Sequence, residues 1–145
     1  MKKMMALVAT LVFAFTACAD DYQRVVQFRS LPVSAQSFIQ KHFNQEDVSR
    51  VIVEKEGLFN EYSVYMKDAT EIDFNHQGNL LSVDCQYSPV PASIIPQTIV
   101  EYVNYHYPDD FITEYVVKTR RLEIGLSNDL ELIFDLSGNF LGMDD

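Results

Sequence analysis

The chain contains one sequence pattern twice, and this duplication limits the folds open to it more than any other feature. Residues 71–84 read EIDFNHQGNLLSVD and residues 131–144 read ELIFDLSGNFLGMD, with six of the fourteen positions identical. In each copy an Asn or Asp begins a four-residue stretch that ends in Gly78 or Gly138. Such a side chain can bond its own turn backbone, and the glycine can take a positive φ. The pattern therefore predicts the same hairpin turn, between the third and fourth strand, in two places.

The duplication extends upstream to two predicted helices, over residues 31–43 and 95–107. Apolar or aromatic residues recur at i, i+3, i+4, i+7 and i+8, which is the stripe of an amphipathic helix. Pro32 and Pro96 stand at equivalent positions near the start, where proline removes no needed donor. The stripes consist of Ala35, Phe38, Ile39, His42 and Phe43 in the first helix, and Ile99, Tyr102, Val103, His106 and Tyr107 in the second.

Each predicted helix is followed by four segments with the composition of β-strands. Val, Ile and aromatic residues alternate with polar ones, which is typical of strands with one buried face. In the first copy these segments are 48–55, 62–66, a third with Ile72 and Phe74, and 80–84; in the second they are 112–119, 122–126, a third with Leu132 and Phe134, and 140–144.

These segments predict an α+β fold of two tandem helix-plus-four-strand units. One unit of about 55 residues can bury little apolar surface, so we expect the two to share an antiparallel sheet with both helices on one face. The connector 85–95 contains Pro89 and Pro91 and is expected to be extended. The predicted divisions are 1–19, a signal peptide; 20–88, the first unit with an N-terminal extension; and 89–145, the second unit, in one structural body.

The first residues have the composition of an export signal. Lys2 and Lys3 precede an apolar run, residues 4–15, and small residues follow it. The run has roughly 12 residues, fewer than the ~20 that span a bilayer. Residues 1–19 are therefore expected to be a signal peptide that directs the protein to the periplasm.

Cys18 leaves two processing routes open. Residues 17–19 read Ala-Cys-Ala, an A-x-A site for ordinary signal peptidase, which would release a soluble product. Residues 15–18 read Phe-Thr-Ala-Cys and are similar to a lipobox, which would make Cys18 the lipidated first residue of an outer-membrane lipoprotein. Cys85 then stands alone in the folded part, where we expect a packed residue and no disulfide.

The charge of the chain excludes some classes of partner. Removal of Lys2 and Lys3 with the signal leaves nine basic against 21 acidic residues, a formal charge of −12. Nucleic acids and anionic lipid surfaces require a positive protein face, so neither is an expected partner. Contact with a membrane is expected only through a lipid anchor.

Several short motifs, in their tandem order, resemble a known family. They are Leu31-Pro32, Phe38-Ile39 and His42-Phe43, the two Phe-x-x-x-Gly turns, the bridge 85–91 and the terminal Met143-Asp144-Asp145. Together they are similar to the PepSY-like, β-lactamase-inhibitor-like periplasmic proteins of Bacteroides-type bacteria. The resemblance implies paired helix-plus-four-strand units with a common sheet, as in β-lactamase inhibitor protein, and a non-enzymatic binding or regulatory module. No motif here matches an inhibitory loop.

The sequence contains few signs of catalysis. It has no H-E-x-x-H, C-x-x-C, S-x-x-K or G-x-S-x-G motif, and its five glycines form no phosphate-binding loop. His42 and His106 are expected to pack in the last turns of their helices. An enzyme is therefore the third hypothesis, and no cofactor is predicted.

The acidic turns suggest calcium as an alternative ligand. Asp73, Asn75 and Asp84 fall at positions 1, 3 and 12 of an EF-hand-like spacing. Asp135 and Asp144 repeat positions 3 and 12, although an isoleucine replaces the first ligand. A hairpin explains the same residues without calcium, so both interpretations stay open. The alternative function is a calcium-responsive periplasmic module.

The sheet face turned away from the helices is the other candidate surface. If the apolar positions of the strands point to the helices, Tyr65, Lys67, Glu123 and Glu131 lie on this open face. Tyrosine beside charged groups suits protein recognition, although an ordinary solvated face has a similar composition. We predict a binding protein that recognises a protein or peptide through this face.

Overall fold

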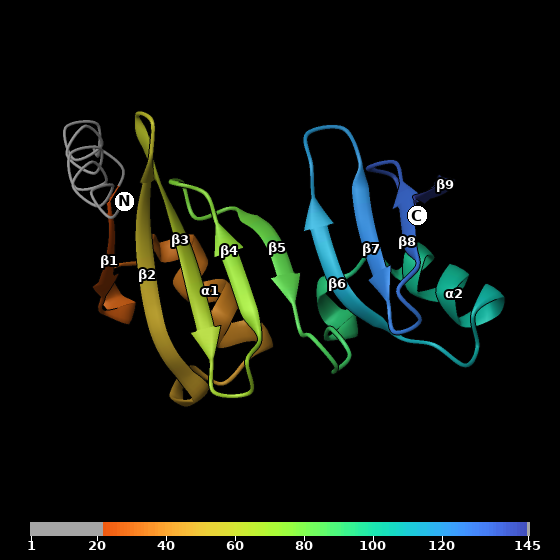
Figure 1. The fold of residues 1–145 in the computed structure, drawn as a ribbon, viewed down its shortest axis with the longest axis horizontal. Helices are drawn as coiled ribbons and strands as arrows, with labels where there is room; N and C mark the ends of the chain where they lie inside the picture. The colour runs from red at the N-terminus through yellow and green to blue at the C-terminus, as the bar shows by residue number, and fades with distance from the viewer. Residues whose placement is uncertain (1–21, 145) are drawn as a thin grey trace, which may run out of the picture.

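Two helices and nine strands form the part of the protein that the structure, a computed structural model, describes: residues 22–144 (Figure 1). The predicted signal peptide and Cys18 lie outside the described residues. All neighbouring strands are antiparallel, and they follow one another across the sheet in chain order. The predicted α+β class is therefore confirmed. No helix within residues 22–144 has the length and apolarity to cross a membrane.

The chain passes from one edge of the sheet to the other without returning. Helix α1 follows β1, and helix α2 lies between β5 and β6. The strands are β1 (Gln23–Val26), β2 (Val48–Glu56), β3 (Phe59–Met66), β4 (Glu71–Phe74), β5 (Leu80–Asp84), β6 (Ile112–Val117), β7 (Leu122–Leu126), β8 (Glu131–Phe134) and β9 (Phe140–Asp144), and the helices are α1 (Val33–His42) and α2 (Gln97–His106).

The eight predicted strands and both predicted helices are present. Each helix begins directly after its proline, because Pro32 and Pro96 occupy the N-cap position with extended backbone angles. Strand β1 was not predicted from the sequence. It has four residues and three of them are exposed, so no buried periodic face marks it. Pairing with β2 holds it at the edge of the sheet.

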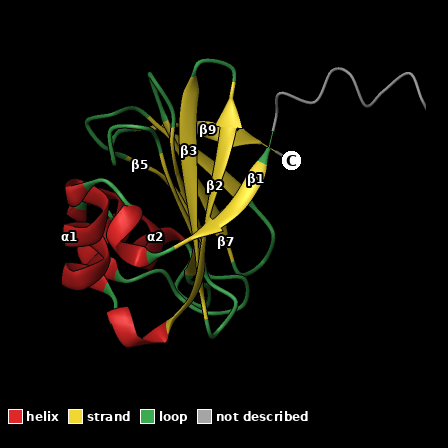
Figure 2. Cartoon of the chain, turned by 90° about the vertical axis from the view of Figure 1, so that its left-hand side faces the viewer, coloured by secondary structure: helices red, strands yellow, loops and turns green. Residues whose placement is uncertain are grey.

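Both helices cover the same face of the sheet, as predicted (Figure 2). The buried positions of the predicted stripes, Ala35 and Ile39 on α1 and Ile99 and Val103 on α2, belong to one hydrophobic cluster with the inward side chains of the strands. The largest of these, Phe74 and Phe134, are completely buried; each meets a ring from the overlying helix edge to face, Phe38 at 5.5 Å and Tyr102 at 5.3 Å between centroids. Burying such side chains is the main favourable term in folding.

The turns β4–β5 and β8–β9 have the predicted geometry. Asn75 Oδ1 accepts backbone hydrogen bonds from Gln77 and Asn79 at 3.0 and 2.9 Å, and Asp135 Oδ1 accepts two equivalent bonds, both of 2.9 Å. Gly78 and Gly138 have φ values of 83° and 87°. These turns pack against the first turns of the helices, where Ser34 Oγ donates to the carbonyl oxygen of Gln77 at 2.9 Å. Each turn thus positions a helix as well as reversing the chain.

The connector between β5 and α2 is fixed to the sheet by backbone bonds. The N–H of Val90 donates to the carbonyl of Ile112 at 2.8 Å, and that of Cys85 to Thr113 at 2.9 Å. Cys85 is buried, as predicted, and burial raises the pKa of its thiol. Strands β5 and β6 pair directly, so the sheet continues without a break between the two halves of the chain.

Candidate functional site

The register of the strands places five carboxylates in one row across the open face of the sheet. In consecutive strand pairs, Glu71 lies opposite Asp84, Asp84 opposite Glu114, and Glu131 opposite Asp144. Gly125 of β7 completes the row between Glu114 and Glu131. Side chains alternate along a strand, and Val83 and Leu132, the sequence neighbours of Asp84 and Glu131, are buried under the helices. We call Glu71, Asp84, Glu114, Glu131 and Asp144 the acidic row.

Gly125 leaves space for the carboxylate at the centre of the row. A Cβ atom at this position would lie 3.1 Å from Glu114 Cβ and 3.4 Å from Glu114 Oε2. Glu114, Glu123, Gly125 and Glu131 surround a hollow of about 30 Å³, large enough for about one water molecule. Three carboxylates therefore converge where β7 has no side chain.

Two carboxylates of the row, Glu71 and Glu114, have a raised pKa. Burial raises the pKa of Glu114 first, and the charges of Asp84, Glu131 and Glu123 raise it further. The pKa of Glu71 is also raised, first by burial and then by Asp73 and Asp84, against the opposing hydrogen bond from Tyr65. Like charges at this spacing favour the neutral form. The same repulsion favours any positive group that approaches the row.

Tyr65 and Arg50 extend the row at its β2–β3 end. The Tyr65 hydroxyl donates to Glu71 Oε1 at 3.0 Å, and the guanidinium carbon of Arg50 lies 4.5 Å from the centre of the Tyr65 ring. Burial raises the pKa of Tyr65, and the hydrogen bond to Glu71 raises it further. An aromatic ring with its hydroxyl fixed in this way provides contact area at little cost in side-chain entropy.

A second row of the open face contains a carboxylate oxygen without a partner. Asp73 lies between Ser63 and Ser82 in the strand register. Its Oδ2 accepts a hydrogen bond from Ser82 Oγ at 3.1 Å, whereas its Oδ1 is buried and has no hydrogen-bond partner in the described part of the chain. Buried polar oxygens are normally satisfied, so this atom is an exception among the described residues.

The structure brings together only some of the residues predicted for recognition. Tyr65 and Glu131 lie in one row, separated by five strand intervals or about 24 Å. Glu123 is on the same face and is paired with Arg121 at 2.8 Å. Lys67 is not in the row, because β3 ends at Met66 and Lys67 lies in the following turn.

The calcium candidates do not form one EF-hand-like loop. Asp84 and Asp144 belong to the acidic row, Asp73 is on β4, and the oxygens of Asn75 and Asp135 accept backbone bonds of the two turns. These bonds, mainly with Asn139, lower the pKa of Asp135. Within residues 22–144 no three or more His, Cys, Asp or Glu side chains are arranged to hold a metal ion.

Sequence reasoning did not identify Glu114, the centre of the acidic row. Alternation from Tyr115, which is buried, places Glu114 on the face turned away from the helices, whereas alternation from Ile112 would place it on the helix side. The irregular pairing between Ile112 and Glu114 allows Ile112 and Tyr115 both to be buried. The neighbours of Glu114 are set by the β5–β6 register, which joins residues 30 positions apart. No local pattern could have predicted that pairing.

The arrangement of the chain is similar to that of proteins of one family. Residues 60–142 match the sequence model of the family described as "putative beta-lactamase-inhibitor-like, PepSY-like". No curated protein matches the chain.

Solved structures from Bacteroides species share the fold. A "putative calcium-regulated periplasmic protein" from Bacteroides thetaiotaomicron is 33% identical, with a TM-score of 0.81 over 85% of this chain and 97% of that one. Two "putative periplasmic" proteins from Bacteroides vulgatus have TM-scores of 0.79. One, of the DUF2874 family, is 30% identical over 88% of this chain and 99% of its own. The other, of unknown function, is 33% identical over 86% and 99%. With its family match over more than half its length, the chain belongs to the PepSY-like, β-lactamase-inhibitor-like family.

Proposed function

We propose that the protein is a non-enzymatic binding protein of the periplasm that recognises a protein or peptide through the open face of its sheet. One observation carries this proposal: the acidic row crosses a face that no described helix covers. The helices lie on the other face, where the apolar strand positions are buried. The open face is therefore available to a partner.

The chemistry of the row indicates a partner with lysine or arginine side chains. Burial and mutual repulsion disfavour ionised Glu71 and Glu114, and a positive group on the row would offset both. The row extends across the sheet from β4 to β9. An extended peptide segment with several positive side chains can therefore contact more than one of its carboxylates. Charge complementarity of this kind mainly accelerates association and gives specificity, and salt screens it.

The test replaces charges of the row without changing side-chain size. We expect the Glu114→Gln/Glu131→Gln double variant to bind a lysine-rich peptide or an envelope partner more weakly and with less dependence on salt. Glu101→Gln is the matched control, because Glu101 is an exposed carboxylate on α2, away from this face. Equal binding by the double variant and the wild type would exclude the acidic row as the recognition surface.

The tyrosine end of the row needs a separate test. Tyr65→Ala removes the ring that Arg50 covers and the donor to Glu71. We expect it to reduce capture of an envelope partner, and Glu123→Ala to have a smaller effect because Arg121 already occupies that carboxylate. Undiminished capture by Tyr65→Ala would remove tyrosine from the proposed surface.

Calcium responsiveness is the second candidate function. Two observations favour it: the unpartnered buried oxygen of Asp73, and the calcium-regulated description of the relative from Bacteroides thetaiotaomicron. A calcium ion bound only by the folded state would raise the melting temperature in millimolar calcium relative to EDTA. Asp73→Asn should remove this rise, and Asp135→Asn should retain it. The absence of any rise would exclude this function for the folded protein.

Export by residues 1–19 is part of the proposal. The family relatives are described as periplasmic, which supports a periplasmic location for this protein. Mass spectrometry of the mature N-terminus separates the two routes at Cys18. A lipidated cysteine indicates an outer-membrane anchor, and an unmodified start after Ala19 indicates a soluble protein.

We also propose that the chain after the signal peptide consists of two tandem units, residues 20–88 and 89–145. The equivalent order of a helix and four strands supports this division. So do the matched turn glycines and the matched pairs of helix and strand aromatics. The common hydrophobic cluster explains why neither unit is expected to fold alone.

A further inference from the structure

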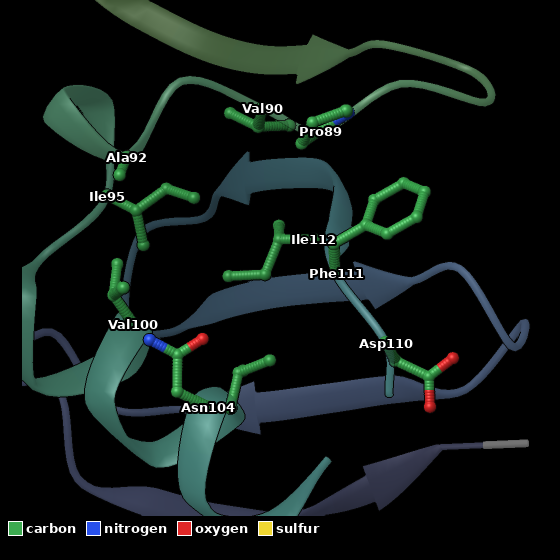
Figure 3. A pocket seen from close by; sticks show the side chains of 10 residues that line it. Pro89, Val90, Ala92, Ile95, Val100, Asn104, Asp110, Phe111 and Ile112 are labelled. Carbon is green, nitrogen blue, oxygen red and sulfur yellow. The ribbon is translucent and has the colours of Figure 1, made fainter. Parts of the chain in front are cut away.

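A cavity opens on the helix side of the sheet, between the connector, α2 and the start of β6 (Figure 3). Its volume is about 270 Å³. The wall is mainly apolar, and its principal side chains are Val90, Ile95, Val100, Val103, Phe111 and Ile112. The cavity is separate from the acidic row, which lies on the opposite face of the sheet.

The first half of the chain has a larger side chain at the corresponding position. A shift of 64 residues relates the short 3-10 helix Ala92–Ile94 to the 3-10 helix Phe28–Ser30, and each is followed by a buried aliphatic residue and a proline. Phe28 is half-buried and packs against the hydrophobic cluster. At the equivalent position Ala92 lines the cavity. At this position the second half therefore has a methyl group where the first half has a phenyl ring.

A second replacement widens the same space. Position 100 of α2 is valine, whereas its equivalent in α1 is Gln36. The Gln36 amide donates to the carbonyl of Arg29, within the 3-10 helix, at 3.3 Å. It also donates to the carbonyl of Leu31, the residue that follows this helix, at 2.8 Å. Val100 has no polar group to make such bonds. Ala92 on the connector and Val100 on α2 are smaller than their equivalents in the first half, and they leave the apolar wall of the cavity exposed.

We propose that this cavity binds a phenylalanine side chain of a partner polypeptide, beside Ala92, the position equivalent to Phe28 of the first half. An apolar cavity of about 150 Å³ is sufficient for benzene, so the present one accommodates a phenyl ring with its Cβ. Aromatic rings in such pockets are common anchors of protein interfaces.

Asn104 gives the site a polar group for the backbone of the partner. It lines the cavity from α2, and its amide is directed toward the space between α2 and the connector (Figure 3). Within the described residues its side chain makes no hydrogen bond, so its donors and its acceptor are free for a peptide N–H or C=O. Asp110, at the other side, is already bonded by Ser127 Oγ at 2.9 Å and Asn128 Nδ2 at 3.0 Å.

The experiment uses the full exported chain and N-acetyl-phenylalanine amide as the probe, with N-acetyl-alanine amide as the control compound. In ¹⁵N-correlated spectra we expect the phenylalanine probe to shift the amide signals of Val100, Asn104 and Ile112, and the alanine probe to leave them unchanged. Asn104→Ala should weaken the binding, since it removes the bonds to the probe backbone. Equal and weak responses to both probes would overturn the proposal.

Variants that copy the first half test whether the cavity is the binding site. Ala92→Phe should fill the cavity from the connector, and Val100→Gln should narrow it from α2. We expect each to weaken binding of the phenylalanine probe at least about tenfold, a loss of roughly 1.4 kcal/mol. Ala92→Ser keeps the cavity open and should bind like the wild type. Retained binding in either filling variant, with the fold verified by its spectrum, would refute the assignment.

Discussion

Gly78→Ala tests how strongly the hairpin turn and helix α1 depend on each other. Gly78 has a φ of 83°, and a Cβ added there would lie 2.7 Å from Pro32 Cβ and would also collide with Ser34 Oγ. The left-handed backbone costs a non-glycine residue about 1–2 kcal/mol. Overpacking at a well-packed contact costs a further ~1–3 kcal/mol. We therefore expect a loss of about 2–5 kcal/mol in the free energy of unfolding.

Substitutions at two other glycines allow the cost of the left-handed backbone to be measured separately from the cost of overpacking. Gly57 has a φ of 62°, yet no atom lies within 4 Å of an added Cβ; Gly142 has neither a positive φ nor a close neighbour. Gly57→Ala should therefore lose only the backbone term, about 1–2 kcal/mol, and Gly142→Ala should be nearly neutral. Gly138→Ala should behave like Gly78→Ala, because its Cβ would meet Thr98 on α2.

Urea unfolding followed by circular dichroism measures all four variants on the same scale. For a domain of this size each kcal/mol corresponds to about 3–5 °C in melting temperature, which provides an independent check. The excess loss of Gly78→Ala over Gly57→Ala measures the packing of turn against helix. If the two variants lost equal stability, the turn would not position the helix and the argument would be wrong.

Three further predictions concern the core, the acidic row and the division into units. Phe134→Ala removes a completely buried ring and should cost about 3–5 kcal/mol in chemical unfolding; a loss below 1 kcal/mol would contradict the packing. Glu114→Gln should stabilise the protein at pH 7. The raised pKa means that the folded state binds the proton more tightly, so the ionised group destabilises it at higher pH. The gain should shrink as pH falls through that raised pKa and vanish below the ordinary value of 4.5, when unfolding is compared at pH 7 and pH 4. Residues 20–88 expressed alone should show no cooperative unfolding transition, since they contain only half of the hydrophobic cluster; a sharp monomeric transition would disprove a shared core.

Much of the fold could be predicted because its signals are local. Pro32 and Pro96 fix where the helices begin, and Gly78 and Gly138 fix where the chain reverses. Strand β1 escaped prediction because it is exposed and owes its conformation to pairing with β2. Lys67 was assigned to the open face by extending the alternation of β3 one residue too far, since Met66 ends that strand.

The sequence by itself determined the helices, eight of the strands, the buried face of the second and third strand in each unit and the two glycine turns, because alternation, helical period and turn chemistry act over a few residues. Only the tertiary structure decided which carboxylates meet. Glu114 stands beside Asp84 because β5 and β6 pair across the connector, a contact that no short-range pattern encodes. The cavity beside Ala92 likewise depends on how the connector and α2 pack against β6. Both candidate sites depend on how the elements pack against one another, which no pattern over a few residues specifies.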